Sequence, residues 1–219
     1  MTLRRAASIT IIIILLSGFL FFSLKIAQKK EACYQAKGEY PPLIVLALAA
    51  AGRGELGSGK FGGKPNHLDL SLLQPGDILL GGNPGSSYGF FTHAGLYAGN
   101  NQVVDMYIST GVYLTEAKAY QRYYDRAAIL RVKASPDQKK AAVDYVLAQI
   151  GKPFFILAPK KEDGLWYCTK LIWRAYLAQG INLNVLKGYW VLPDSFWLSP
   201  QVQVIYFTKG QRINDEPFL

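Results

Sequence analysis

The chain has 219 residues, half of them hydrophobic, and a formal net charge of +9. Five of its 24 basic residues and none of its acids lie within the first 30 positions, so the rest of the chain carries a surplus of only four positive charges. A surplus that small, without a basic surface interleaved with aromatic residues, argues against nucleic acid as a partner.

Residues 6–24 form an uncharged run rich in Ile, Leu and Phe. A helix of that length spans roughly 28 Å, close to the hydrocarbon core of a bilayer. The run is longer than the core of a typical signal peptide, and no small-x-small cleavage site follows it. We expect an uncleaved, single-pass membrane anchor, with a cleaved signal peptide as the alternative. Basic residues flank the run on both sides, so they do not set its orientation.

The residues after the anchor divide into a linker and a larger domain. Residues 43–51 are an apolar run too short to cross a membrane. A Gly-rich stretch at 52–66 indicates a flexible loop, and it lacks a phosphate-binding pattern because Phe61 follows Lys60. The sequence therefore predicts three units: an anchor at 1–30, a linker with a short apolar helix and the Gly-rich loop at 31–66, and a catalytic domain at 67–219.

Within that domain, short apolar segments bounded by turn residues predict strands. They cover residues 78–80, 92–98, 102–107, 112–114, 128–132 and 202–207. Gly99, Asn100 and Asn101 predict a hairpin turn, because Gly and Asn tolerate positive φ angles.

Two helices complete the domain. The first begins at Ser135, which forms a capping box with Gln138, and runs to about residue 150. Its apolar stripe would contain Ala142, Val146 and Ile150. The second helix covers residues 167–179 and ends at a glycine. The sum is an α+β fold, in which a small antiparallel sheet is packed with helices.

The hairpin brings together two polar side chains. If its loop has an odd number of residues, Gly95 faces Asp105 and His93 faces Tyr107. His93 and Asp105 are then diagonal neighbours on one sheet face, and the carboxylate can orient the imidazole. A plain two-residue loop would put them on opposite faces. A site built from this pair therefore requires an odd loop or a bulge.

Cys168 stands at the start of the second helix, where the positive end of the helix dipole favours a thiolate. The backbone N–H groups of Cys168 and Thr169 are helix-start donors that can hold an oxyanion. Gly164 lets the chain turn sharply into the helix. Cys168, His93 and Asp105 are thus the candidate nucleophile, base and orienting carboxylate.

Other interpretations of these residues remain open. Cys168 can be a buried structural cysteine, or it can pair with Cys33 in a disulfide. His67 is expected to be a solvated loop histidine. The tyrosines at 120, 123 and 124 and the four tryptophans suit core packing better than a substrate groove. Two Cys and two His without paired short spacings argue against structural zinc, and the sequence indicates no other metal or cofactor.

Four motifs, in this order, resemble the circularly permuted branch of the NlpC/P60 papain-like superfamily, the YiiX-like proteins related to lecithin:retinol acyltransferase. They are Leu-Gln-Pro-Gly-Asp-Ile at 73–78, Thr-His-Ala-Gly-Leu-Tyr at 92–97, Gly-Lys-Pro-Phe at 151–154 and Tyr-Cys-Thr-Lys-Leu-Ile-Trp at 167–173. The resemblance implies a papain-like fold, with Cys168 as nucleophile and His93 as general base. Asp105 matches the third polar position, where His or Glu is common, and Tyr167 is implied to line the acyl pocket.

These observations predict a membrane-anchored cysteine hydrolase that cleaves amide bonds through a thioester acyl-enzyme. Cell-wall peptides are the expected substrate, which places the catalytic domain outside the cytoplasm, in the periplasm or on the outer face of the membrane. One alternative is a thiol-dependent acyltransferase, amidase or esterase acting on lipids. Another is a binding domain without catalysis.

Overall fold

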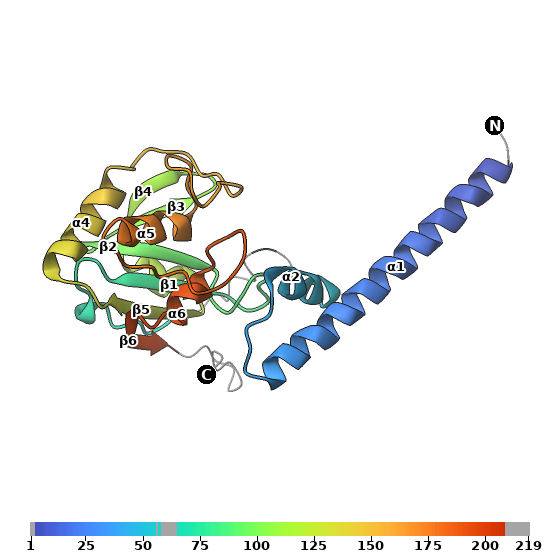
Figure 1. The fold of residues 1–219 in the computed structure, drawn as a ribbon, viewed down its shortest axis with the longest axis horizontal. Helices are drawn as coiled ribbons and strands as arrows, with labels where there is room; N and C mark the ends of the chain where they lie inside the picture. The colour runs from blue at the N-terminus through green and yellow to red at the C-terminus, as the bar shows by residue number, and fades with distance from the viewer. Residues whose placement is uncertain (1–2, 56, 58–64, 209–219) are drawn as a thin grey trace.

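The computed structural model describes residues 3–55, 57 and 65–208. A long helix, α1 (Leu3–Ala36), extends from an α+β domain, and a short helix, α2 (Leu43–Gly52), packs beside its C-terminal half (Figure 1). The predicted α+β fold class is confirmed. The loop expected at 52–66 lies largely outside the described residues.

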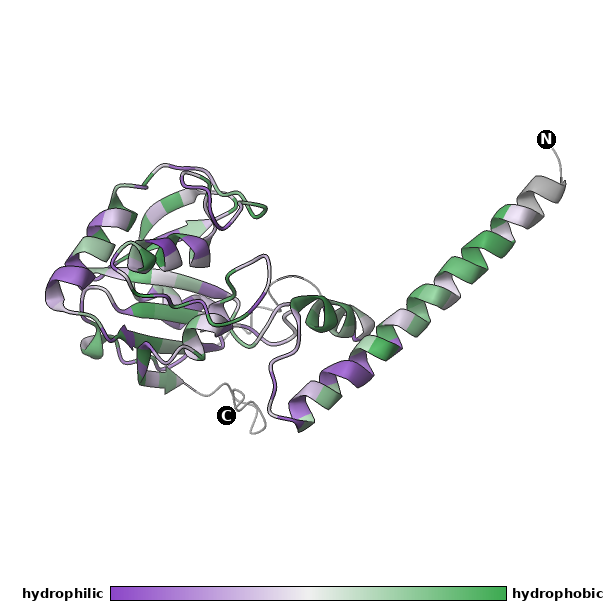
Figure 2. Cartoon of the chain, in the orientation of Figure 1, coloured by the Kyte–Doolittle hydropathy of each residue, from purple (hydrophilic) through white to green (hydrophobic). Residues whose placement is uncertain are grey.

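The two halves of α1 differ in their surroundings. Its large hydrophobic side chains between positions 9 and 22 are 54–73% exposed, and Figure 2 shows this half as mostly green with paler turns between. The other half continues as helix through the polar residues that the sequence suggests as linker, and Glu31 forms an ion pair with Arg53 just beyond α2 at 2.6 Å. Among the described helices, α1 alone has the length and composition to cross a membrane.

Six antiparallel strands form one sheet in the order β4-β3-β2-β1-β5-β6. The strands are β1 (Ile78–Gly82), β2 (His93–Gly99), β3 (Gln102–Tyr107), β4 (Gly111–Glu116), β5 (Arg126–Val132) and β6 (Val202–Thr208). All six correspond to predicted strands. The central strand β1 is buried along its whole length, because both faces of the sheet are covered.

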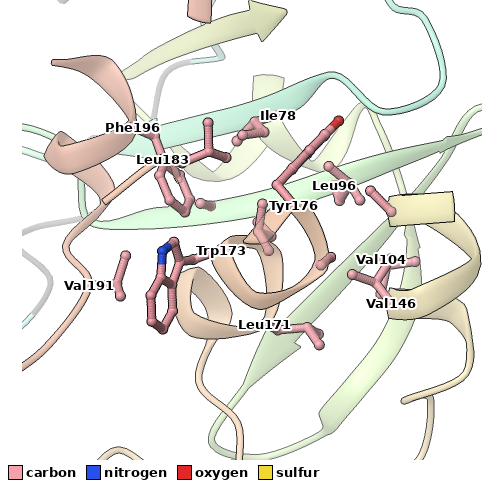
Figure 3. Close-up of a cluster of buried hydrophobic side chains, with 14 of the residues drawn as sticks. Ile78, Leu96, Val104, Val146, Leu171, Trp173, Tyr176, Leu183, Val191 and Phe196 are labelled. Atoms are coloured by element: carbon pink, nitrogen blue, oxygen red, sulfur yellow. The ribbon is translucent and has the colours of Figure 1, made fainter. Parts of the chain in front are cut away.

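Hydrophobic clusters lie on both faces of the sheet. On one face, helices α4 (Pro136–Leu147) and α5 (Cys168–Leu177) pack over side chains such as Ile78, Leu96 and Val104 (Figure 3). On the other face, Leu79 packs with Tyr120 and Tyr124 from α3 (Ala119–Tyr123) and its flank. Alternate residues of β1 therefore serve two cores, as the period of a strand requires.

Helix α4 begins as predicted and ends earlier. Ser135 Oγ accepts from Gln138 N at 3.2 Å, and Gln138 Oε1 accepts from Ser135 N at 2.9 Å, which completes the capping box. The helix stops at Leu147, so Ile150 leaves the stripe and is 44% exposed. The predicted apolar stripe is wrong at Ile150. The residues after the helix leave its axis, and Gly151 N donates a hydrogen bond to Val112 O at 2.9 Å.

Three short helices were not predicted. They are α3, α6 (Pro193–Trp197) and the 3₁₀ turn Leu70–Leu72. Each has three to five residues, too few for a hydrophobic periodicity to emerge from the sequence.

Candidate active site

The β2–β3 hairpin has a bulge that sets its register. Asn100 and Asn101 form a two-residue turn with φ angles of 51° and 60°, and the pairing shifts between Tyr97 and Gly99. Beyond the shift, Leu96 pairs with Val104 and Tyr97 with Val103, the register that an odd loop would give. The sequence predicts either an odd loop or a bulge, and the structure has the bulge, so the prediction is confirmed.

This register brings His93 and Asp105 into contact. The Nε2 atom of His93 is hydrogen-bonded to Asp105 Oδ1, and only 6% of the histidine and 2% of the aspartate are exposed. Asp105 Oδ1 also accepts from Met106 N at 2.7 Å, and its Oδ2 accepts from Tyr120 Oη at 3.3 Å. The carboxylate is therefore fixed on both oxygens, and the imidazole keeps Nδ1 for another partner.

A layer of tyrosines, whose stacking on His93 the sequence does not predict, holds the imidazole in place. The ring of Tyr107 stacks on His93 at 4.2 Å between centroids, the ring of Tyr124 lies nearly parallel at 5.9 Å, and the two phenols are hydrogen-bonded to each other. Gly81 lies opposite His93 on β1, and a Cβ there would stand 2.4 Å from the Tyr124 ring. The missing side chain of Gly81 leaves the space that the Tyr124 ring occupies. This glycine is therefore the feature of the sequence that indicates the tyrosine layer.

Cys168 is the first residue of α5, and Tyr167 is its N-cap residue. Gly164 has a φ of +90°, the turn that the sequence predicts. The side chain of Lys170 is buried and folds back toward the preceding loop, where its ammonium donates to the carbonyls of Glu162 and Leu165. That ammonium lies 5.1 Å from the ring centroid of Trp166, so Lys170 fixes the entry into the helix.

Tyr167 and Thr169 flank the nucleophile and both bind one residue of a distant loop. Tyr167 Oη accepts from Val191 N at 2.9 Å, and Thr169 Oγ1 donates to Val191 O at 2.5 Å. Both side chains are buried. Their side chains anchor residues 181–192 beside Cys168, while the backbone N–H of Thr169 stays at the helix start as predicted.

The electrostatics of the site favour a charged imidazole. Burial lowers the pKa of His93, but the charges of Asp105 and Cys168, together with side-chain hydrogen bonds to both, outweigh it and raise the pKa to about 10. The thiol of Cys168 is therefore near the imidazole, whose Nε2 atom is bound to Asp105. The three predicted residues converge, and the arrangement suits a thiolate–imidazolium pair.

Asp194 is a further buried acid that supports the site. Its carboxylate accepts from the N–H groups of Phe90 and Phe91, each at 2.7 Å, and from Tyr40 Oη at 2.6 Å. Phe91 lies two residues before His93, whereas Tyr40 belongs to the segment that connects α1 with α2. Asp194 therefore connects the segment after the anchor helix to the start of the histidine strand.

A cavity of about 180 Å³ lies on the aspartate side of the imidazole. Its lining consists of Asp105, Ala119 and the tyrosines 107, 113, 120, 123 and 124. Tyr120 and Tyr124 are buried, as the core-packing interpretation predicts, whereas Tyr123 is 57% exposed at the edge of this cavity. Cys168 does not line this cavity.

The alternative roles for the cysteines and histidines are also resolved in part. Cys33 and Cys168 are both free, so the disulfide interpretation is wrong. His67 is exposed, as expected for a solvated loop histidine. Within the described part of the chain, no three His, Cys, Asp or Glu side chains gather as a metal site would need.

Known proteins are similar to this chain over most of the domain. A family model described as "Permuted papain-like amidase enzyme, YaeF/YiiX, C92 family" matches residues 73–206. The protein YycO of Bacillus subtilis strain 168 is 28% identical over 144 residues, which are 64% of this chain and 58% of that protein. The chain thus matches somewhat more than half the length of this relative.

Similarity extends to solved structures. The crystal structure of the metalloprotein yiiX from Escherichia coli O157:H7 superimposes with a TM-score of 0.49 and 18% sequence identity. The match covers 61% of this chain and 96% of that one.

Proposed function

Because this chain belongs to the permuted papain-like amidase family, as its four motifs predict, we propose that it is a membrane-anchored cysteine hydrolase that cleaves amide bonds in cell-wall peptides. Family membership supports the amidase class. The hydrogen bond between His93 and Asp105, beside the thiol of Cys168, is the single observation that carries the mechanism.

The mechanism begins with the thiolate of Cys168, which attacks the carbonyl carbon of the scissile amide. The developing oxyanion accepts hydrogen bonds from the backbone N–H groups of Cys168 and Thr169, where one such donor is worth about 3 kcal/mol. The imidazolium of His93 gives its proton to the leaving amine, and the C–N bond breaks. A thioester between substrate and Cys168 remains.

Water then completes the cycle. Neutral His93 removes a proton from the water, whose oxygen attacks the thioester carbonyl. The C–S bond breaks, the acid product leaves, and the thiolate–imidazolium pair is restored. Throughout, Asp105 holds Nε2 of the ring, so that Nδ1 is the nitrogen that exchanges protons.

The choice of a cell-wall substrate rests on placement. An exposed apolar helix at the N-terminus supports a membrane anchor. We propose that the domain lies on the outer side, where peptide cross-links are the neighbouring amides. A lipid substrate is the second candidate, because apolar side chains at 155–157 are exposed close to the nucleophile.

The test incubates the full-length protein in detergent with peptidoglycan fragments and, separately, with phospholipids. Mass spectrometry should find new peptide termini with the native protein and with Cys33→Ala, but not with Cys168→Ala. Products from phospholipids alone would select the lipid enzyme. Products from neither substrate would favour the binding domain.

A further inference from the structure

Two loops beside the nucleophile expose large apolar side chains to solvent. Their exposed fractions are 44% for Phe155, 51% for Ile156, 55% for Leu157, 43% for Val185 and 48% for Tyr189. We call these five residues the apolar rim. Removing such side chains from water is favourable, so the rim forgoes stabilisation in the free protein.

The rim is held in place by hydrogen bonds between the loops. Tyr189 Oη donates to Leu157 O and Trp190 Nε1 donates to Ile156 O, both at 2.7 Å. Lys160 Nζ donates to Gly188 O at 2.7 Å. These bonds use backbone carbonyls as acceptors, so they fix the loops together while the aliphatic side chains remain outside.

The rim also lies next to the catalytic cysteine. Phe155 N donates to Trp166 O at 2.7 Å, two residues before Cys168. The other loop is bound at Val191 by the two residues that flank Cys168. Any surface that covers the rim therefore lies beside the segment that carries Cys168.

The chemistry of the rim suits the boundary of a lipid bilayer. Aliphatic side chains are joined there by Tyr189 and Trp190, the aromatic types that gather at membrane interfaces. Lys160, Lys161 and Lys187 lie on the same loops, and Asp163 is paired with Arg174 at 2.8 Å, so Glu162 alone offsets three lysines. Such a surplus attracts anionic headgroups.

The position of the rim supports the same partner. Figure 1 shows both loops on the side of the domain toward α1, and Figure 2 shows apolar residues at the tip of the loop that follows α4. Tyr40, in the segment that follows α1, is bound to Asp194 in the domain, which limits how far the domain can turn away. The rim and the anchor can thus meet one membrane.

We propose that the apolar rim inserts into the headgroup region of the bilayer that holds α1, and that it keeps Cys168 close to the membrane surface. The inference rests on the proposed membrane anchor. It adds a second contact, which positions the site against substrates presented at that surface.

The tryptophans provide a direct test, because all four lie in the domain and none lies in α1. The full-length protein is reconstituted in vesicles of phosphatidylcholine and phosphatidylglycerol that carry brominated acyl chains. Bromine should quench the native emission, and Trp190→Phe should lose most of the quenching. Trp197→Phe is the matched control and should retain it.

A second variant, Ile156→Ser with Leu157→Ser, separates a membrane contact from a substrate contact. It should lose at least half of the bromine quenching, yet cleave a soluble peptide in detergent as fast as the native protein. The proposal is overturned if native protein in vesicles shows no quenching, or if the double variant keeps its quenching, whatever its rate of hydrolysis in detergent. Neither result depends on whether cell-wall peptides are the natural substrate.

Discussion

His93 and Asp105 project from two strands of one hairpin, whereas Cys168 stands at the start of a helix entered through loops. Stacked tyrosines and hydrogen bonds on both carboxylate oxygens bury the first pair. The thiol is half-buried, and its neighbours Tyr167 and Thr169 are bound to another loop. The contrast suggests a division of labour: the sheet fixes the proton-transfer groups, while the loops present the nucleophile to substrate.

The largest effect is expected for the nucleophile. Cys168→Ala removes the attacking sulfur, so turnover of a peptidoglycan fragment should fall by about 10⁴-fold or more. Cys33→Ala, which alters the exposed free thiol of α1, should leave turnover unchanged. Substantial turnover by Cys168→Ala would assign the reaction to another group.

A substitution of Asp105, on the sheet side of the site, should change the pH dependence of the reaction as well as its rate. Asp105→Asn removes the charge that raises the His93 pKa, so the alkaline limb of the kcat/KM profile should move down by about one to three pH units. Turnover at neutral pH should fall by about 10²–10⁴-fold. An unchanged limb would show that the carboxylate does not set the protonation of His93.

The stacked tyrosines are tested by adding one methyl group. Gly81→Ala places a Cβ 2.4 Å from the Tyr124 ring, and overpacking of this kind should lower the free energy of unfolding by about 3 kcal/mol. Gly18→Ala in α1 meets nothing within 4 Å and serves as the control. Equal thermal stability of the two variants in detergent would contradict the tight packing around His93.

Tyr40→Phe removes the phenol that donates to the buried carboxylate of Asp194. A hydrogen bond to a charged acceptor is worth about 2 kcal/mol, which thermal unfolding in detergent should register. Tyr145→Phe, which removes a 3.5 Å contact to exposed Asp163, should change stability by less than about 0.5 kcal/mol. Similar losses for both variants would mean that the Tyr40 contact adds little.

The last prediction concerns the dependence of stability on pH. The pKa of His93 is raised to about 10 in the folded protein, so the imidazolium form stabilises the fold fully below its unfolded pKa of about 6.5. This contribution should disappear as the pH rises through about 10. Native protein should therefore lose more stability than Asp105→Asn between pH 7 and 10.5, as measured by thermal unfolding. Parallel curves would contradict the raised pKa.

Much of the fold was predictable because its signals are local. The capping box at Ser135, the glycine before Cys168 and the turn at Asn100 and Asn101 each depend on a few neighbouring residues. The bulge in the hairpin followed from requiring His93 and Asp105 to share a face. The short helix that presents Asp194 had no such signal, since its role appears only when Phe90 and Tyr40 reach it.

The sequence by itself determined the family and the α+β class, because motifs, turns and caps depend on neighbouring residues, and it singled out Cys168, His93 and Asp105 as candidates. The tertiary structure alone decided what surrounds them: the tyrosines stacked on His93, the carboxylate that binds Tyr40, and the exposed apolar rim. These features depend on residues that are distant along the chain and adjacent in space, and no local pattern encodes such proximity.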